Sequence, residues 1–334
     1  MKNIVIMATG GTIAGAGEQG KDIGYKSGAL EAQTLIDAVP ELKTVANIRV
    51  EQVCNINSDD ISSEIWMTLA RRIKELSKCA DVDGFVVMHG TDTMEETAFF
   101  LGLTLGTQEQ TAAKPVVLTG SMRPATAAEP DGPANLLFAV KSAVELSERG
   151  SAGHVILSQS EGSSDYPVYV AFAGKLMDVW KVQKVHANSL DAFAEVGDSS
   201  ACHLGPVLGS AFAFDISSLH SLPKVSVLYF NADADAELVR FAAERSAGLV
   251  IAGAGAGEFS QSWAAAIAEV VAKEIPVVIS TRINRGCIVP EQLLVPGTIA
   301  AYNLPPAKAA VLLRLTLTVT NDVQEIQKIF ASKK

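Results

Sequence analysis

Two kinds of segment alternate along most of this chain: short apolar runs rich in β-branched residues, and longer stretches with the apolar spacing of amphipathic helices. The short runs predict strands, and the longer stretches predict helices that cover them. Strands are expected at 3–8, 48–56, 85–88, 115–119, 154–160 and 167–175, then at 225–229, 249–252 and 276–279. Helices are expected at 30–39, 62–76, from 93 onward, at 133–146, 236–243, 261–273, 307–317 and 323–330. This alternation predicts α/β domains with mainly parallel sheets and crossover helices.

A loop-rich region from about Asp191 to Pro223 divides this alternation into two series. We therefore predict a larger N-terminal α/β catalytic domain at 1–205, with a mainly parallel sheet and crossover helices. A linker follows at 206–222, and a smaller C-terminal α/β domain with a parallel sheet at 223–334. The chain has 334 residues, which is enough for two hydrophobic cores.

Composition excludes several classes of partner. The net charge of −10 argues against nucleic acid and anionic membranes, since both attract basic surfaces. No apolar run reaches the roughly 18 residues that a membrane span needs. The first apolar run, Ile4–Met7, is too short for a signal peptide, so we expect a cytoplasmic protein. The alternative is a periplasmic protein whose signal peptide has been removed.

Neither a metal site nor a disulfide framework is expected. The four cysteines, Cys54, Cys79, Cys202 and Cys287, are scattered and form no CxxC motif. No HExxH motif or other metal-ligand spacing occurs. Most of the cysteines are therefore expected to be small buried hydrophobic residues.

Polar side chains follow successive predicted strands at their carboxyl ends. They are Thr12, then Ser58 with Asp59, then Thr91 with Asp92, then Ser121. Each alone could be a helix N-cap, and Thr93-Met94-Glu95-Glu96 has the pattern of a capping box. Four in series along one sheet edge favour a polar crevice, because ligands bind outside the carboxyl ends of strands in open α/β sheets.

A threonine hydroxyl needs a base before it can act as a nucleophile. His89 is the only histidine at a candidate strand end, and we expect it to be a packed strand residue rather than that base. A desolvated lysine held by a carboxylate such as Asp92 is the other candidate, although spacing alone does not identify the lysine. Gly10 and Gly11 precede Thr12, where backbone amides could hold a developing oxyanion.

Two glycine-rich segments leave alternatives open. The stretch from Gly15 to Gly28 contains Tyr25 and is either a lid that carries a phenol or a disordered surface loop. The segment Gly253–Gly257 follows a predicted strand, but it lacks both GxGxxG spacing and a Walker lysine. We expect a close backbone approach to a ligand or subunit there rather than phosphate binding.

The motifs resemble those of bacterial L-asparaginases, the exported type in particular, over nearly the whole chain. The resemblance is carried by Ala8-Thr9-Gly10-Gly11-Thr12-Ile13-Ala14-Gly15 and by His89-Gly90-Thr91-Asp92-Thr93-Met94-Glu95-Glu96. Three further segments support it, 38–42, 119–124 and 131–136. It implies a hydrolase that converts L-asparagine to L-aspartate and ammonia through a threonine acyl-enzyme. It also implies that no cofactor or metal is needed, and that the enzyme is a homotetramer, a dimer of dimers with sites shared between subunits.

The resemblance also implies roles for individual residues. The catalytic residues would be Thr12 as nucleophile, Tyr25, and a second group of Thr91, Asp92 and Lys184. Substrate would be bound by Gly11, Ser58, Asp59, Thr91, Asp92 and Glu258. Which of the two threonines attacks first stays open.

This chain departs from the family pattern in four places. Asp59 stands where glutamine or glutamate is usual in the exported type, and Ala256 and Glu258 stand where asparagines are common. The segment 152–166 resembles an insertion, which bears on the alignment of Lys184. The family position that pairs with Cys79 falls near Thr107, so that disulfide is not expected.

Two other functions are weighed against an L-asparaginase. The first is a glutaminase-asparaginase or a related amidase of the same superfamily, including the amide-hydrolysing subunit of a transamidation complex. The second is a nucleotide-binding α/β protein without hydrolytic activity, which the glycine spacing at 253–257 disfavours.

Overall fold

The computed structural model describes residues 1–21, 24, 26, 28–105, 114–149, 168–196 and 213–331. They form two compact units, one of Met1–Glu195 with Asp215–Ser217 and one of Val196–Phe214 with Ser218–Lys334. Both units are α/β, as the alternating pattern predicts. The linker at 206–222 stays a prediction, because its first part lies outside the described residues.

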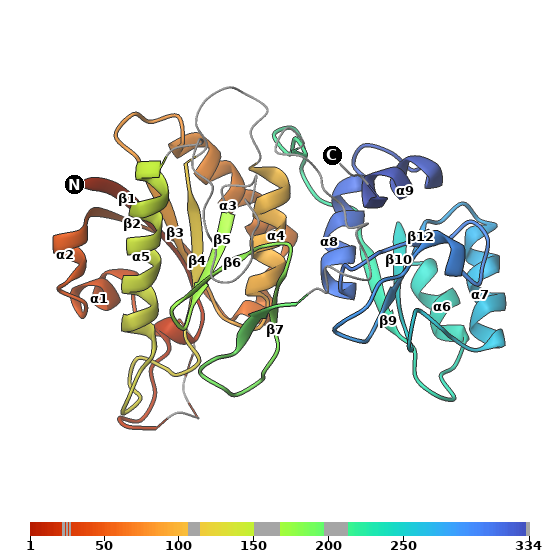
Figure 1. The fold of residues 1–334 in the computed structure, drawn as a ribbon, viewed down its shortest axis with the longest axis horizontal. Coiled ribbons are helices and arrows are strands. Elements are labelled where there is room, and N and C mark those ends of the chain that lie inside the picture. The colour runs from red at the N-terminus through yellow and green to blue at the C-terminus, as the bar shows by residue number, and fades with distance from the viewer. Residues whose placement is uncertain are drawn as a thin grey trace. The chain divides into compact units, whose positions relative to one another are not determined.

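A six-stranded, mainly parallel sheet forms the centre of the first unit (Figure 1). Its strands are β1 (Lys2–Gly10), β2 (Ala46–Ile56), β3 (Gly84–Met88), β4 (Val116–Thr119), β5 (Val168–Phe172) and β6 (Lys175–Asp178). They lie in the order β2-β1-β3-β4-β5-β6, and every neighbouring pair is parallel except β5 with β6.

This strand order contains one reversal, between β1 and β3. The chain leaves β1 toward β2 on one side and leaves β3 toward β4 on the other side. Because these two connections diverge, they leave a crevice at the carboxyl ends of β1 and β3, where ligands bind in open α/β sheets. The topology therefore predicts a site formed by the residues that follow Gly10 and Met88.

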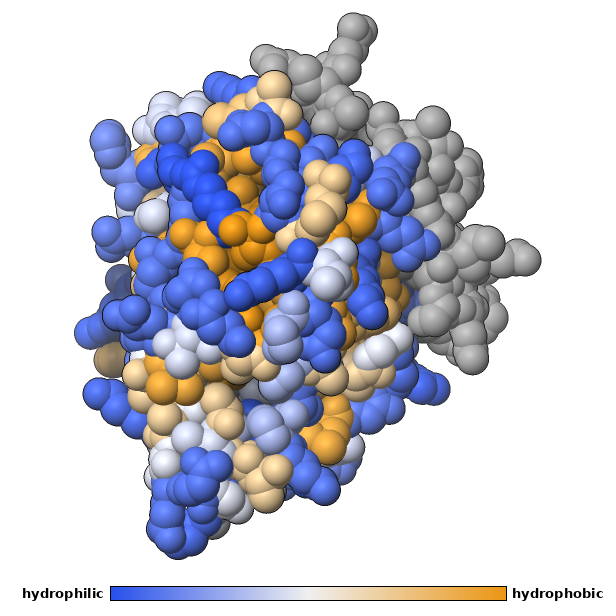
Figure 2. Space-filling model, turned by 90° about the vertical axis from the view of Figure 1, so that its left-hand side faces the viewer, coloured by the Kyte–Doolittle hydropathy of each residue, from blue (hydrophilic) through white to orange (hydrophobic). Residues whose placement is uncertain are grey.

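Helices cover both faces of this sheet (Figure 1). Helices α1 (Ala32–Asp37), α2 (Leu42–Val45) and α5 (Gly132–Arg149) pack on one face, against the buried side chains of Ile4, Ile6 and Ala8 in β1. The other face carries α3 (Ser63–Leu76) and α4 (Met94–Thr104). Alternate residues of β1 thus face opposite layers, which explains why its central part, Ile4–Ala8, is apolar throughout. Seen from the left of Figure 1, polar side chains cover much of the surface, with hydrophobic atoms in the recesses between them (Figure 2).

Helix α4 is buried all round, so it has no polar face of the kind that surface helices show. Phe99, Phe100 and Leu101 are completely buried, and Phe100 stacks on Trp66 of α3 with ring centroids 5.2 Å apart. On another side Phe99 meets Trp180 edge to face at 4.7 Å. Packing on several sides fixes the first turn of α4, which follows the predicted site.

Two predictions about strands in this unit are wrong. The run 167–175 is not one strand, because the chain turns at Ala173 and Gly174, whose φ angles are 49° and 74°, and Lys175 begins the antiparallel strand β6. The region from Asp191 is not only loop, because β8 (Phe193–Glu195) pairs antiparallel with β7 (Val182–Lys184) in a separate two-stranded sheet. The expected strand 154–160 and the insertion 152–166 lie outside the described residues.

The second unit contains a four-stranded, all-parallel sheet in the order β12-β11-β10-β9. Its strands are β9 (Val225–Tyr229), β10 (Gly248–Gly253), β11 (Val277–Thr281) and β12 (Ile299–Ala300). Its helices are α6 (Glu237–Ala243), α7 (Gln261–Val271), α8 (Pro306–Thr316) and α9 (Val323–Ala331). Strand order follows chain order without a reversal, so this sheet has no crevice between diverging connections.

The glycine loop after β10 makes a close backbone approach to itself, and the ligand or subunit expected near it stays a prediction. A Cβ atom at Gly253 would lie 2.4 Å from the carbonyl carbon of Gly257, in the same loop. Backbone bonds between Ala254 and Glu258, of 2.7 and 2.8 Å, close that loop. The close backbone approach is therefore made within the chain itself.

The expectation for the cysteines holds only in part. Cys54 and Cys79 are free and half-buried, whereas Cys287 is disulfide-bonded.

None of the described helices is long and apolar enough to cross a membrane.

Candidate active site

The polar residues that follow the strands lie where the topology predicts a site. Thr12 begins a short 3-10 turn directly after β1, and Thr91 lies in the junction between β3 and α4. Ser58 begins a second 3-10 turn, Ser58–Asp60, after β2. Ser121 differs, because its buried hydroxyl donates to the carbonyl of Arg123 at 2.7 Å and therefore braces its own loop.

The Thr12 and Thr91 loops touch through glycine backbone. Gly11 has a φ of 78°, and a Cβ atom there would lie 2.4 Å from the backbone nitrogen of Gly90. The Gly11 N–H donates to the carbonyl of Ile56 at 2.8 Å, which ties the loop after β1 to the end of β2. Glycine at position 11 thus lets the two threonine-bearing loops approach each other closely.

Lys184 joins the second of these loops. Its Nζ lies 2.8 Å from the Thr91 hydroxyl oxygen and 2.6 Å from Oδ1 of Asp92. Thr91 is buried and the Lys184 side chain is 15% exposed, whereas the Asp92 side chain is 68% exposed. The contact with Thr91 is thus largely shielded from water, while the carboxylate stays accessible.

This geometry suits proton transfer from a hydroxyl. A charged lysine donates to the Thr91 oxygen, and a neutral lysine in the same position can accept the hydroxyl proton. The neighbouring carboxylate compensates the charge that the lysine then acquires. The residues expected as an activating group therefore lie together, although Lys184 is more than 90 positions from Thr91 in the sequence.

Ser58 connects the turn after β2 to the same junction. Its hydroxyl oxygen accepts the N–H of Asp92 at 3.2 Å, and its carbonyl accepts the Thr93 hydroxyl at 2.6 Å. The predicted capping box at Thr93 is therefore wrong, since this hydroxyl caps no backbone N–H of α4 and binds Ser58 instead. Because the Ser58 oxygen accepts from Asp92, its own proton can be donated to a ligand.

His89 is fully buried and hydrogen-bonded at both ring nitrogens, as expected for a packed residue. Its Nδ1 lies 2.7 Å from the carbonyl of Gly90, and its Nε2 lies 2.9 Å from the Thr97 hydroxyl. A carbonyl only accepts, so Nδ1 carries the proton and Thr97 donates to Nε2. The Thr97 oxygen also accepts the indole N–H of Trp66 at 2.8 Å. Burial lowers the pKa of His89 to about 4, which makes its ring a weak base, and its one acceptor nitrogen already receives the Thr97 hydroxyl, so His89 is not the base.

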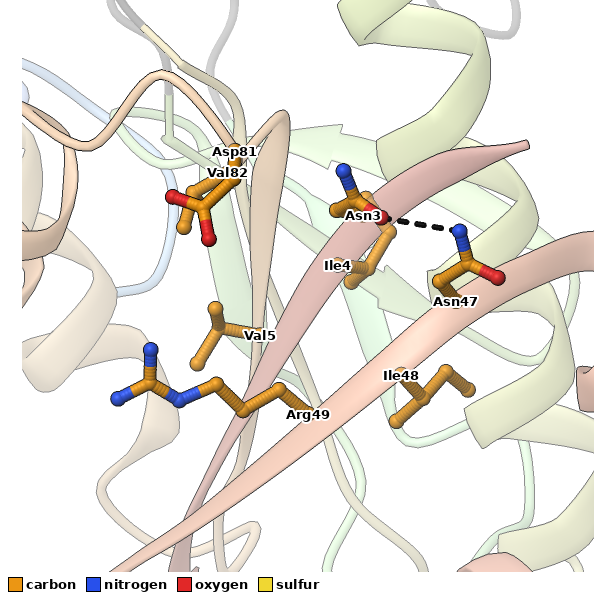
Figure 3. Close-up of a pocket in the computed structure, with 8 residues that line it drawn as sticks. All are labelled: Asn3, Ile4, Val5, Asn47, Ile48, Arg49, Asp81 and Val82. Atoms are coloured by element: carbon orange, nitrogen blue, oxygen red, sulfur yellow. Dashed lines mark hydrogen bonds between the residues drawn. The ribbon is translucent and has the colours of Figure 1, made fainter.

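Two cavities differ in what they can do. One, of about 390 Å³, opens beside the lysine and is lined by Asp92, Glu95, Lys184, Val185, His186 and Ala187. The other, of about 190 Å³, lies at the amino ends of β1 and β2 between Asn3, Arg49 and Asp81 (Figure 3). Seven residues of extended chain, about 20 Å, separate Val5 in this second cavity from Thr12. The second cavity is therefore not part of the threonine site.

Three of the predicted site residues have no described contact that tests their roles. Tyr25 lies outside the described residues. Asp59 is exposed in the 3-10 turn after β2, and Glu258 is exposed in the second unit, in the loop after β10. Around Tyr25, Ala16 and Lys26 pair through backbone bonds of 2.9 and 3.0 Å.

Among the described residues, no group of three or more metal-ligating side chains occurs.

Sequence reasoning missed the role of Glu95. Its carboxylate oxygen Oε2 accepts the backbone N–H of Lys184. The sequence did offer a signal, because Glu95 lies in the same motif as Thr91 and Asp92, but the apparent capping box gave that motif a purely local explanation.

Two family models match this chain. A family model described as "Asparaginase, N-terminal" matches residues 3–207, and one described as "Glutaminase/Asparaginase C-terminal domain" matches residues 224–330. The chain belongs to the asparaginase family. Its two α/β units thus correspond to two recognised parts of that family, and the threonine site lies in the N-terminal part.

Individual members of the asparaginase family match over nearly their full length. The chain is 38% identical to L-asparaginase 2 of Bacillus subtilis (strain 168), over 99% of this chain and 86% of the relative. It is 35% identical to the glutaminase-asparaginase of Pseudomonas fluorescens biotype A, over 99% and 90% of the two chains. The crystal structure of a probable cytoplasmic L-asparaginase from Campylobacter jejuni aligns with a TM-score of 0.84 and 36% identity, covering 99% of each chain.

Proposed function

We propose that this protein hydrolyses the side-chain amide of L-asparagine to give L-aspartate and ammonia. The observation that carries the proposal is the position of the Lys184 ammonium, within 2.8 Å of the Thr91 hydroxyl and 2.6 Å of the Asp92 carboxylate. These groups lie where the strand order reverses, between β1 and β3, next to the loop of Thr12. Nucleophilic attack on an amide needs a hydroxyl and a base that activates it, and this cluster offers two hydroxyls, a lysine and a carboxylate that compensates the charge of the lysine.

In the first half-reaction the Thr12 oxygen attacks the amide carbon, and its proton passes to a base. Backbone N–H groups of the glycine-rich loop stabilise the oxyanion of the tetrahedral intermediate. The C–N bond then breaks, the base returns the proton to the leaving nitrogen, and ammonia departs while the acyl group stays on Thr12 as an ester. The phenol of Tyr25 assists this step if the segment that carries it closes over the substrate.

In the second half-reaction water attacks the ester carbon and releases aspartate. Thr91 and Lys184 activate this water, because a neutral Lys184 draws the proton from Thr91, which in turn draws one from the water. Asp92 compensates the charge on Lys184. Lys184 and Asp92 are also able to activate Thr91 as the first nucleophile. We therefore propose only that both threonines are needed, and the order in which they attack stays open.

Substrate binding follows from the charges of asparagine. The Ser58 hydroxyl donates to the α-carboxylate, which lies beside the Gly11 backbone, and the exposed Asp92 carboxylate accepts from the α-ammonium. Asp59 reaches the same ammonium either directly or through a water molecule. Glu258 would complete the site from the C-terminal unit of a neighbouring subunit, in a homotetramer built from two dimers.

Glutamine hydrolysis is the second candidate function. The relative from Pseudomonas fluorescens, 35% identical, is named a glutaminase-asparaginase. Glutamine is longer by one methylene, and a single methylene changes selectivity by only about 1–3 kcal/mol. Both amides therefore belong in the test.

The proposed function is tested by ammonia release from L-asparagine and L-glutamine, with the wild-type protein and the variants Thr12→Ala and Thr91→Val. We expect the wild type to release ammonia and each variant to lose about 100-fold or more in rate. Ser121→Ala is the matched control, because it removes a strand-end hydroxyl that braces its own loop. Absence of ammonia release from both amides would refute the proposal, and near-full activity of Thr12→Ala would refute the role of that residue.

We further propose that the enzyme acts in the cytoplasm. The related structure from Campylobacter jejuni carries the word cytoplasmic in its name, whereas a relative from Haemophilus influenzae is named a probable periplasmic L-asparaginase. The disulfide at Cys287 is the observation against a cytoplasmic location, since disulfides persist mainly in oxidising compartments. Fractionation of the native cells decides between the two compartments.

A further inference from the structure

Lys184 is held at two points by one short segment of the chain. Thr91 and Asp92 contact its Nζ, and Glu95, in the first turn of α4, accepts its backbone N–H. The segment 91–95 therefore contacts both the end of the lysine side chain and the backbone from which that side chain starts. The first two contacts belong to the chemistry proposed above, and the third has no part in it.

Contacts with neighbouring elements hold the short strand that carries Lys184. Strand β7 has only three residues and pairs with the three residues of β8, in a sheet separate from the six-stranded one. A pair of such short strands is marginally stable on its own, and this pair is held against the six-stranded sheet by the Phe193–Phe172 ring contact at 4.9 Å and by the Asp178 N–H, which donates to Glu195 at 2.8 Å. Its position relative to the end of β3 therefore depends on side-chain contacts with neighbouring elements, and Glu95 provides a hydrogen bond from α4 to the last residue of β7.

The anchor itself is firmly placed. Glu95 follows Met94, which is completely buried, and precedes the buried Thr97 and Phe99 on the same helix. A carboxylate in the first turn of a helix is also stabilised by the helix dipole. Because α4 is packed on several sides, a hydrogen bond to its first turn fixes the Lys184 backbone relative to Thr91.

We propose that Glu95 is a positioning residue that sets the reach of Lys184 toward Thr91. The inference rests on the proposed amide hydrolysis. The Lys184 Nζ contacts Thr91 at 2.8 Å and Asp92 at 2.6 Å at the same time, so a displaced Cα forces the side chain into a conformation in which these two contacts are no longer both made. A misplacement of about 1 Å at a reacting group costs up to roughly 100-fold in rate. Glu95 therefore affects the chemical step and leaves substrate affinity nearly unchanged.

The test compares Glu95→Ala, which removes the acceptor, with Glu95→Gln, which keeps a carbonyl oxygen in its place. Glu64→Ala is the matched control, because Glu64 is an exposed first-turn carboxylate of α3. Two readouts are used: hydrogen exchange of the Lys184 amide, which needs no activity, and kcat and KM for L-asparagine.

For Glu95→Ala we expect faster exchange of the Lys184 amide and a kcat reduced by about tenfold to 100-fold, with KM changed less than about threefold. Glu95→Gln restores both readouts, and Glu64→Ala changes neither. If Glu95→Ala does not fold, Glu95→Asp replaces it. Aspartate keeps the charge but is one methylene shorter. The kcat of the Glu95→Asp variant is therefore expected to fall, while the free energy of unfolding of the variant stays unchanged.

The outcomes separate this inference from the proposed function. A wild-type protein that releases no ammonia refutes the function, and the exchange measurement still tests the contact. An active wild type whose Glu95→Ala variant keeps kcat within about twofold overturns the positioning role. A Glu95→Gln variant that loses as much kcat as Glu95→Ala, with normal amide exchange, also overturns it, because charge rather than the hydrogen bond would then matter.

Discussion

The buried histidine next to the site is expected to make the folded protein less stable in mild acid. His89 is fully buried, its Nδ1 donates to Gly90 and its Nε2 accepts from Thr97. Protonation of Nε2 would turn this acceptor into a donor and place an unpaired charge in the core. Burial therefore lowers the pKa of His89 from its ordinary value of 6.5 to about 4.

The sign and size of the effect follow from proton linkage. Between these two pKa values the unfolded chain binds a proton at His89 that the folded protein does not bind. As pH falls below 6.5, the free energy of unfolding decreases, and this decrease ends near pH 4, where the folded protein also takes up the proton. One pKa unit corresponds to about 1.4 kcal/mol, so the full loss is about 3 kcal/mol, of which about 2 kcal/mol falls between pH 7 and pH 5.

The assay compares urea unfolding of the wild type and His89→Asn at pH 7, 6 and 5, at one protein concentration. Asparagine can donate to the Gly90 carbonyl as Nδ1 does, but it does not titrate. We expect the variant to be less stable than the wild type at pH 7 and to lose about 2 kcal/mol less than the wild type on going to pH 5. Equal losses in the two proteins would refute the reasoning, because they would show that other groups cause the acid sensitivity.

Two further predictions concern the close approach of the Thr12 and Thr91 loops, and the aspartate at position 59, where the exported type usually has glutamine or glutamate. Gly11→Ala is expected to destabilise the protein and abolish most activity, because its Cβ would lie 2.4 Å from the Gly90 nitrogen, at a φ that itself costs about 1–3 kcal/mol. Gly20→Ala has a similar φ of 85° with nothing within 4 Å, so a loss of activity as large as that of Gly11→Ala would show that the close approach is irrelevant. Asp59→Gln is expected to lower KM for L-asparagine, since it restores the longer side chain usual in the exported type. An unchanged KM would remove that argument.

The layers of the fold were predictable because their signals are local. The apolar runs that form β1 and β3 and the spaced apolar residues of α3 each determine their element over a few residues. The β5–β6 hairpin was missed because Ala173 and Gly174 interrupt an apolar run without a typical turn dipeptide. Its turn depends on positive φ angles that one glycine signals only weakly.

The threonine site was predictable only in part. Position at the strand ends pointed to Thr12 and Thr91, but no spacing connects Thr91 with Lys184, and only the family resemblance named that lysine. Thr93 shows why local rules fail here, because its hydroxyl binds the carbonyl of Ser58, 35 residues earlier, in place of the helix N-terminus. Contacts between distant segments decide such cases, and a single sequence does not display them.

The central claim is that Lys184 and Thr91 act together in hydrolysing an amide. The most direct measurement is ammonia release from L-asparagine by the wild type, by Lys184→Met and by Thr91→Val, together with the Lys184→Met/Thr91→Val double variant. The account predicts an active wild type, a loss of about 100-fold or more in each single variant, and little further loss in the double variant, because residues that act as one unit are not additive. Unchanged activity in Lys184→Met, or a double variant whose losses simply multiply, would contradict it.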